Sequence, residues 1–514
     1  MKIALIVSII TLASRLLSLV SVQIYMAFFG PQLLALEVYT FALNVPNIVF
    51  NILGTSITAI VVPIYAGLLK TDKIEAGIFI KRMFLIIIGV VLFLMLIGFF
   101  LAPLLVRVSY FSGYYYYEQF AVFALRVMLL SIFFYGINYL FQGILHSHNK
   151  FLLAAMVTIP TSLFIIIYTV GFSSEFGVYG LIYATVIGLS LQGLILALPV
   201  AHRLLNISQI KFYHLKNQKL AKPVKKQRLA AKPVDEHMVK ALQMVAPLLI
   251  SASSFQIMSI FNTTMASHLN IVTIQGFVMN LVLVASLSVI YSITSVYLPK
   301  LSVQWEEDKE KYRQTLEKII LAVLIFMIPA SAAFFILGDE IVSLLVHWGN
   351  FDEDSAALTT TLLGIFGFAA APLGLKEVLD RAYYAQKNSK IPSIVGFLIM
   401  AISLLFTILT VNIFGVYTIA IAYVTSFSIG AICLFVSLKL MNLKFFINLL
   451  KILFATFLMA LVLHAIPILY FTTIGVFLNR LLSLVIPSAL GAITYFAVIY
   501  FLYRKDFNLS IFRK

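Results

Sequence analysis

No charged side chain occurs in the stretch IPSIVGFLIMAISLLFTILTVNIFGVYTIAIAYVTSFSIGAICLFVSL, residues 391–438. Because a helix needs roughly 20 apolar residues to cross a bilayer, this stretch predicts two membrane spans, at 391–413 and 416–438. The whole chain is similar in character: 62% of its 514 residues are hydrophobic and 11% are charged, and the mean hydropathy is +1.04. This composition excludes a chain of soluble domains and indicates a polytopic membrane protein.

Other apolar runs of similar length occupy most of the remaining sequence. They lie at 3–29, 35–69, 83–107, 120–146, 151–172, 177–203, 238–266, 272–299, 315–346, 356–386, 446–471 and 480–503. We therefore predict an all-α integral membrane protein with about 14 transmembrane helices. Arg15 interrupts the first run and no small-residue cleavage pattern follows it, so we expect a span here rather than a signal peptide.

The formal charge of +16 is distributed unevenly along the chain. All but six of the 36 Lys and Arg residues fall in alternate connections or at the two termini, which assigns them to one side of the membrane. The positive-inside rule makes that side cytoplasmic, so both termini are expected in the cytoplasm of a bacterial cytoplasmic (inner) membrane. The longest connection, 204–237, is a basic linker, and we expect it to attract anionic membrane lipids rather than nucleic acid.

Short matches between the two halves of the chain predict an internal repeat. Ser21 to Ile24 matches Ser254 to Ile257, Val62-Pro63 matches Leu298-Pro299, and Asn149 matches Asn388. Their nearly constant spacing favours two six-helix lobes in a parallel pseudo-repeat, followed by two C-terminal helices. The predicted domains are an N-lobe (1–203, helices 1–6), the linker (204–237), a C-lobe (238–440, helices 7–12) and helices 13–14 with a cytoplasmic tail (441–514).

Polar side chains inside the spans are candidates for function, because they are costly in hydrocarbon and tend to face cavities or partner helices. The candidate substrate-binding residues are Arg15, Glu37, Asn44, Asn47, Asn51, Arg126 and Asn280. The set in the second run recurs at helical spacing along one face, and the spacing that relates Pro63 to Pro299 also pairs Asn44 with Asn280. Guanidinium binds phosphate in bidentate fashion, so Arg15 is suited to an anionic head group, with Arg126 second. Hydrogen bonds and salt bridges between helices remain the alternative for all of them.

The predicted helix 356–386 contains four charged residues, Lys376, Glu377, Asp380 and Arg381. Two i,i+4 pairs, Lys376 with Asp380 and Glu377 with Arg381, could neutralise each other locally. The other interpretation is a coupling or gating role, in which these charges change partners as the lobes move. The sequence leaves both open.

Enzyme chemistry has no support in the sequence. HExxH, GxxxxGK[ST] and GxSxG motifs are absent, so neither ATP hydrolysis nor hydrolase activity is expected. Cys433 is the single cysteine, which excludes an internal disulfide and a thiolate zinc site. We predict no catalytic residue, no metal and no cofactor.

Several stretches together resemble one transporter family. They are Ser14-Arg15-Leu16-Leu17, Phe29-Gly30, Pro46-Asn47, Val62-Pro63, Leu125-Arg126-Val127, Gly143 to Pro160, Ala266-Ser267, Leu298-Pro299, Gly349-Asn350-Phe351-Asp352, Asp380 to Ala385 and Lys390-Ile391-Pro392. In order and spacing they resemble the MurJ (MviN) family of lipid II flippases, a branch of the multidrug/oligosaccharidyl-lipid/polysaccharide exporter superfamily. The likeness covers about residues 8–400.

The resemblance implies fourteen helices in two lobes, a central cationic cavity, alternating access and a groove beside helices 13 and 14 for a polyprenyl tail. It implies a flippase for a polyprenyl-diphosphate-linked saccharide, the peptidoglycan precursor lipid II, with Arg15, Glu37, Pro46 and Asn47 at family positions. We expect a monomer, and cell-wall synthesis proteins are the candidate protein partners.

The sequence also departs from the family pattern. Ser21-Val22 stands where relatives commonly have Arg-Asp, and Phe50 or Asn51 replaces an arginine of the second helix. In the predicted helix 272–299, Met279-Asn280 stands where relatives have Asp-Arg. Export of another lipid-linked oligosaccharide or a small amphiphile is therefore the alternative. A membrane glycosyltransferase is a more distant one, since it should show acidic catalytic residues in an outward loop and only Asp352, Glu353 and Asp354 qualify.

Overall fold

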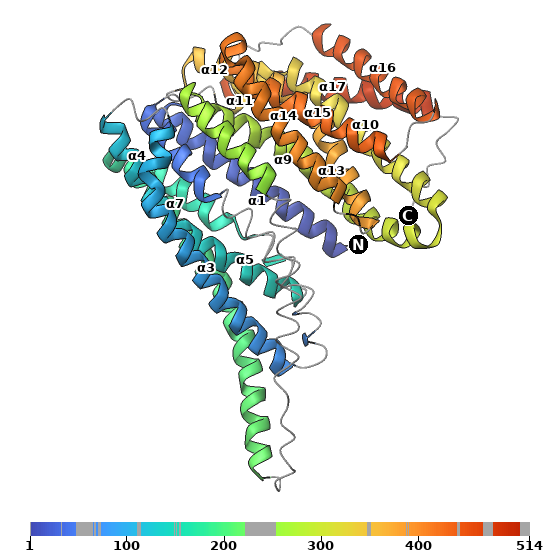
Figure 1. Ribbon diagram of the computed structural model, residues 1–514. Helices are drawn as coiled ribbons and strands as arrows, with labels where there is room; N and C mark the ends of the chain where they lie inside the picture. The colour runs from blue at the N-terminus through green and yellow to red at the C-terminus, as the bar shows by residue number, and fades with distance from the viewer. Residues whose placement is uncertain are drawn as a thin grey trace. The chain divides into compact units, whose positions relative to one another are not determined.

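The chain is described by a computed structural model. The described residues are 2–31, 33–47, 65, 68–69, 73–109, 115–148, 150, 152–153, 156–220, 253–346, 351–386, 388, 390–438, 443–465 and 476–503. All regular secondary structure in these residues is helical (Figure 1). Asn51 and the second half of the basic linker, 221–237, lie outside the described residues.

The chain folds into two compact units. One consists of residues 1–29 and 33–272, and the other of residues 30–32 and 273–514. The helices of the first unit are α1 (Lys2–Phe29), helix 34–47, α3 (Lys73–Val108), α4 (Tyr115–Met128), α5 (Leu130–Ser147), α7 (Ile159–Leu220) and helix 253–268. Within this unit α7 packs against α1 and α5, and α3 packs against α4 and α5. The core of this packing includes Phe79, Ile132 and Leu145, all nearly inaccessible to solvent.

The second unit consists mainly of α9 to α17. Their bounds are α9 (Val272–Glu307), α10 (Lys309–Ile336), α11 (Gly338–Leu345), α12 (Glu353–Gly367), α13 (Ala370–Ala385), α14 (Lys390–Phe414), the short 3-10 helix η2 (Gly415–Tyr417), α15 (Thr418–Ser437), α16 (Leu443–Ala465) and α17 (Val476–Tyr503). Helix α10 is central, because it packs against α12, α13 and α16. The hydroxyl of Tyr495 in α17 donates to the carbonyl oxygen of Ile325 in α10 at 2.7 Å, which attaches the C-terminal pair of helices to this unit.

Membrane spans account for most of these helices. In the described residues, 8 helical segments are long and apolar enough to cross a membrane, and Ala13–Phe29 and Val272–Ser286 are shorter apolar helices. Two of the long segments contain a turn, at Gly177 within Ile159–Val200 and at Gly415 within Lys390–Ser437, so each holds two of the predicted runs. Each predicted run contains helix wherever it is described, which confirms the predicted fold class.

The outer surface of α3 shows why this fold needs a bilayer. Only 11% of its most apolar window is buried within the protein. Phe93 and Phe100 are 62% and 72% exposed, and Leu85 is 60% exposed. Such a surface is stable against lipid chains and would be unfavourable in water.

Equivalent helix contacts in the two units confirm the parallel pseudo-repeat. A Cβ added at Gly136 would lie 2.8 Å from Val91, and one added at Gly374 would lie 3.1 Å from Met327. The spacing in sequence from Gly136 to Gly374, and that from Val91 to Met327, are almost equal to the spacing that the sequence matches predict. The same close approach of the third and fourth helices therefore occurs in both units.

A second pair of contacts shows the repeat with the large and small residues exchanged. In the first unit a Cβ on Gly98 would lie 2.9 Å from the side chain of Leu129. At the corresponding positions of the second unit, a Cβ on Gly367 would lie 2.6 Å from that of Phe334. One small and one large residue fill the space in each case, which conserves the combined volume at the crossing.

Turn geometry sets the register of the repeat. Gly177 and Gly415 have φ values of 54° and 53°, and each separates two consecutive spans. Gly30 and Asn270 have φ values of 83° and 55°, and each follows the first helix of its half. The spacing from Gly30 to Asn270 is longer, by about two helical turns, than the spacing predicted from the match of Ser21 to Ser254. The turns therefore indicate a different register from the one that this match predicts, and the match of Ser21 to Ser254 stays a prediction.

The predicted lobe boundaries are not tested by this division. The second half of the linker that was predicted to separate the lobes, 221–237, lies outside the described residues. Helix 253–268, predicted as the first helix of the C-lobe, belongs to the first compact unit. The four domain ranges therefore stay predictions.

Candidate functional site

Glu37 lies in the first unit on helix 34–47 and is 1% exposed. Its Oε2 accepts a hydrogen bond from the backbone N–H of Val272 at 2.7 Å. Val272 begins α9, where the first N–H groups have no carbonyl partner within the helix. A carboxylate satisfies such a group and also interacts favourably with the positive end of the helix dipole. Glu37 therefore stabilises the start of α9, and its predicted role in substrate binding stays a prediction.

Helix 34–47 is held in place by its buried tyrosine. The Tyr39 hydroxyl lies 2.8 Å from Oγ1 of Thr185 in α7. The Tyr39 ring packs edge-on against Tyr25 of α1, with centroids 5.6 Å apart. These contacts attach helix 34–47 to both α7 and α1, so the polar residues on this helix are carried by a packed element.

Asn44 and Asn47 are half-buried on helix 34–47. They follow Glu37 by about two and three helical turns, which places all three on one side of the helix. Arg15 is half-buried on α1 of the same unit, next to Ser14, whose hydroxyl donates to the carbonyl oxygen of Ile10. The first unit thus carries these four predicted binding residues and also Arg126. Asn280 is exposed on α9 and belongs to the second unit.

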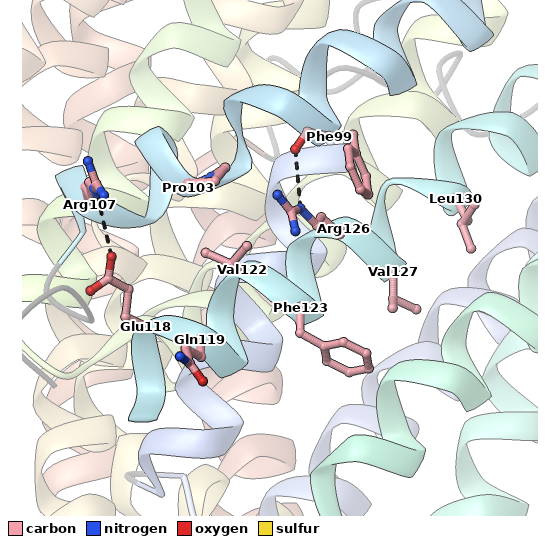
Figure 2. A pocket seen from close by; sticks show the side chains of 10 residues that line it. All are labelled: Phe99, Pro103, Arg107, Glu118, Gln119, Val122, Phe123, Arg126, Val127 and Leu130. Atoms are coloured by element: carbon pink, nitrogen blue, oxygen red, sulfur yellow. Dashed lines mark hydrogen bonds and ion pairs between the residues drawn. The ribbon is translucent and has the colours of Figure 1, made fainter. Parts of the chain in front are cut away.

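Arg126 belongs to a different place in the first unit. Its Nε donates to the carbonyl oxygen of Phe99 at 3.4 Å, and its guanidinium lies 4.3 Å from the centroid of the Phe99 ring. Both contacts are to α3, and Arg126 lines a cavity between α3 and α4 (Figure 2). These contacts place Arg126 beside α3, and its predicted role in substrate binding stays a prediction.

The charged residues of α13 form a local ion-pair group. Lys376 Nζ lies 2.7 Å from Asp380 Oδ2, which confirms the first predicted pair. Lys376 Nζ also lies 3.8 Å from Glu377 Oε1, so both carboxylates share this lysine, whereas the second possible pair, Glu377 with Arg381, stays a prediction. Lys376 Nζ thus lies between the two carboxylates. Because Lys376 is half-buried and Asp380 is buried, an arrangement in which one cation serves both carboxylates is favoured. A coupling role for this group stays a prediction.

One buried amide was missed by the sequence reasoning. Asn138 on α5 is 1% exposed, and neither its amide nitrogen nor its oxygen has a hydrogen-bond partner among the described residues. The spacing from Asn138 to Lys376 equals that from Gly136 to Gly374, so the repeat places Asn138 and Lys376 at equivalent positions. The spacing of the predicted repeat was the signal that could have identified Asn138. An unpaired buried amide is costly, which makes this position a candidate for function.

Among the described residues, no group of three or more His, Cys, Asp or Glu side chains could hold a metal ion. In the first unit, the described residues that were predicted to bind substrate are amides, two guanidinium groups and one carboxylate.

The chain matches known proteins over nearly its full length. A family model described as "Lipid II flippase MurJ" matches residues 26–492. A relative described as a probable lipid II flippase MurJ, from Buchnera aphidicola, is 25% identical over 95% of this chain and 94% of its own length. One with the same description from Borreliella burgdorferi is 25% identical, covering 87% of this chain and 85% of its own length.

Solved structures agree in fold. A structure of lipid II flippase MurJ in an inward closed conformation superimposes with a TM-score of 0.76 at 21% identity, covering 98% of this chain and 99% of that chain. An inward-facing MATE family transporter of the MOP superfamily superimposes with a TM-score of 0.59 at 16% identity, covering 84% and 98% of the two chains. These likenesses show the fold of a multi-pass membrane transporter. Because the family model covers most of the sequence, the chain belongs to the lipid II flippase MurJ family.

Proposed function

We propose that this protein translocates a polyprenyl-diphosphate-linked saccharide, the peptidoglycan precursor lipid II, across the bacterial cytoplasmic membrane. The observation that carries the proposal is the family match over residues 26–492. The two units with equivalent internal contacts support alternating access, in which one half moves against the other around a site. The movement requires no covalent step, so we propose a transporter without enzymatic activity.

The distribution of basic residues supports one orientation. Most Lys and Arg residues lie in alternate connections or at the termini, as expected for segments that stay in the cytoplasm. We therefore propose that both termini are cytoplasmic and that α3 runs outward, from Lys81 and Arg82 near its start to Arg107 near its end.

The substrate site is proposed on the polar face of the first unit. Arg15 supplies the cation for the diphosphate, and the amides of Asn44 and Asn47 hydrogen-bond the remaining oxygens or the sugar. Asn51 and Asn280 complete the proposed site, and the group of Lys376, Glu377, Asp380 and Arg381 is proposed to couple the movement. We propose that the transporter acts as a monomer.

A second substrate class is favoured by the uncharged positions of this chain. Ser21 is buried, and its hydroxyl donates to the carbonyl oxygen of Ser18 at 2.7 Å, so it is engaged within its own helix. Phe277 and Val278, beside Asn280, are buried apolar residues. A site with fewer cations favours a lipid-linked oligosaccharide whose anchor needs fewer ionic contacts. Export of such a lipid is the alternative function.

Complementation distinguishes the two. The protein is expressed, with its membrane level verified, in bacteria depleted of their own lipid II flippase, and growth and outer-leaflet lipid II are scored. Rescue of both is expected. Absence of rescue at a normal membrane level would contradict lipid II as the substrate and favour another lipid-linked glycan.

A further inference from the structure

A cavity of about 880 Å³ lies between α3 and α4 of the first unit (Figure 2). Its lining consists of Phe99, Pro103 and Arg107 from α3 and of Glu118, Gln119, Val122, Phe123, Arg126, Val127 and Leu130 in α4 and at the start of α5. We call this cavity the α3–α4 groove. It combines four polar side chains with an apolar remainder, the combination that binds an amphiphile.

The charges in the groove do not cancel. Arg107 Nε lies 3.7 Å from Glu118 Oε1, so these two side chains neutralise each other. Arg126 contacts only the carbonyl oxygen and the ring of Phe99, and among the described residues no carboxylate forms an ion pair with it. One positive charge therefore remains in the groove.

The position of this charge requires a counter-ion. Arg126 is nearly three helical turns from Tyr116, the start of an apolar segment that ends at Ser147, so it lies about 15 Å along the helix. An unpaired guanidinium at such a depth in a membrane protein is costly unless an anion or water reaches it. A ring face and one long hydrogen bond to a carbonyl are weak substitutes for an anion.

The repeat shows that the polar lining is an addition to the fold. Arg107, Glu118, Gln119 and Arg126 correspond to Ser343, Ala356, Ala357 and Gly364 in the second unit. None of these four can supply a charged side chain. The packing that the repeat shares therefore does not need the cations of the groove.

The corresponding face of the second unit is covered by its own chain. Helix α17 packs against α11, and Arg480 Nη1 of α17 donates to the carbonyl oxygen of Ser343 at 3.4 Å. In the first unit, the equivalent residue Arg107 has a side chain that is 71% exposed. The groove is thus the open counterpart of a face that protein covers in the other unit.

We propose that the α3–α4 groove binds an anionic phospholipid, of the phosphatidylglycerol class, through its headgroup phosphate. The Arg126 guanidinium and the Gln119 amide donate hydrogen bonds to phosphate oxygens, and Phe99, Phe123 and Leu130 contact the acyl chain. In the proposed orientation the lipid belongs to the outer leaflet. The site is separate from helix 34–47, so it is a site for a bound membrane lipid and does not depend on which substrate is transported.

Native mass spectrometry of the detergent-purified full chain tests the proposal. Three probes are titrated: phosphatidylglycerol, diacylglycerol with the same acyl chains, and inorganic phosphate. We expect phosphatidylglycerol to bind the unchanged protein tightly, and Arg126→Gln to weaken that binding on the order of tenfold, because a charge-assisted hydrogen bond is lost. Arg126→Lys retains the charge without the fork of donors and should show an intermediate loss.

The matched control is Arg82→Gln, an exposed arginine on the same helix α3. It should leave this binding unchanged. Gln119→Leu, which retains every charge, should weaken the binding less than Arg126→Gln and keeps the test usable if the arginine variants fail to fold. Equal affinities of the unchanged protein and Arg126→Gln, or diacylglycerol binding as tightly as phosphatidylglycerol, would overturn the proposal. Binding of inorganic phosphate with the same dependence on Arg126 would overturn the assignment to a lipid.

Discussion

The Glu37 carboxylate accepts the backbone N–H of Val272 at 2.7 Å, although the two residues are far apart in the sequence. Glu37 lies on helix 34–47, whereas Val272 is the last residue of the first compact unit and the first of α9. The Glu37 side chain, which would be costly in hydrocarbon, thereby accepts a hydrogen bond from a backbone N–H group that has no partner within its own helix. The bond shows how a residue predicted to bind substrate already has a partner in the protein.

Replacing Glu37 should separate its structural role from a role in transport. Glu37→Ala leaves a buried N–H without its acceptor and should destabilise the protein by about 1–3 kcal/mol. Glu37→Gln keeps an oxygen acceptor and should recover most of the loss. Thermal unfolding of the purified protein measures both, with the exposed Glu307→Ala as control. Equal melting temperatures of the alanine and glutamine variants would contradict the role of the carboxylate oxygen.

Arg15 and Asn47 should be essential to transport while leaving the protein in the membrane. Arg15→Ala removes the cation proposed for the diphosphate, and Asn47→Leu removes an amide of the polar face. Each should abolish complementation of a lipid II flippase deficiency at an unchanged membrane level, whereas the exposed variant Lys309→Gln should complement. Full activity of both site variants would rule out the proposed site.

The Lys376–Asp380 pair can be tested by removing one charge and then both. Lys376→Met leaves the buried Asp380 carboxylate without its 2.7 Å partner and should cost about 3–5 kcal/mol of stability. Lys376→Met with Asp380→Leu replaces the pair by apolar groups and should recover much of that stability. Melting temperatures test the structural part, and complementation tests the coupling role. A stable but inactive double variant supports coupling, and a stable active one contradicts it.

Glycine packing in the second unit predicts opposite effects of one substitution at two sites. Gly367→Ala should destabilise, because the new Cβ would lie 2.6 Å from the Cβ of Phe334, which cannot rotate away. Gly396→Ala should be neutral or stabilising by up to about 1 kcal/mol, since nothing described lies within 4 Å of its added Cβ and alanine favours helix. Thermal unfolding compares the two directly. A stable Gly367→Ala would show that the crossing of α10 and α12 can open.

Asp352 should stabilise α12 in a manner that depends on pH. Its carboxylate accepts the backbone N–H of Ser355 at 2.9 Å, and the side chain and backbone of Ser355 lower the pKa of Asp352. A lowered pKa means that the stabilisation is complete above the unfolded pKa of about 4 and is lost as the pH falls through the folded value.

The Asp352→Ala variant measures this contribution. It should cost about 1 kcal/mol at neutral pH, as is usual for a lost helix cap. The difference in melting temperature from the unchanged protein should shrink as the pH falls below about 4. A difference that is constant from neutral to strongly acidic pH would contradict the cap.

The spans could be predicted from the sequence because a bilayer imposes a condition on each segment by itself. The run at 391–438 must contain two helices, since backbone groups in hydrocarbon have to be satisfied within the segment. The uneven distribution of charge and the internal repeat can likewise be read from the order of residues along the chain. A local match cannot distinguish shifts of whole helical turns, so the register that the match of Ser21 to Ser254 predicts for the first helices stays a prediction, and the turns at Gly30 and Asn270 indicate a longer spacing.

The roles of individual polar residues depended on tertiary structure. The sequence marked Glu37, Arg126 and Glu377 as unusual, but their partners Val272, Phe99 and Lys376 follow from packing. Val272 and Phe99 lie on helices other than those of Glu37 and Arg126. Lys376 lies on the same helix as Glu377, and its Nζ lies between two carboxylates. The sequence by itself determined which groups had to leave lipid, because transfer of charge into hydrocarbon is costly wherever it occurs. The tertiary structure decided where each group went, because hydrogen bonds and ion pairs act over a few ångströms between atoms that only folding brings together.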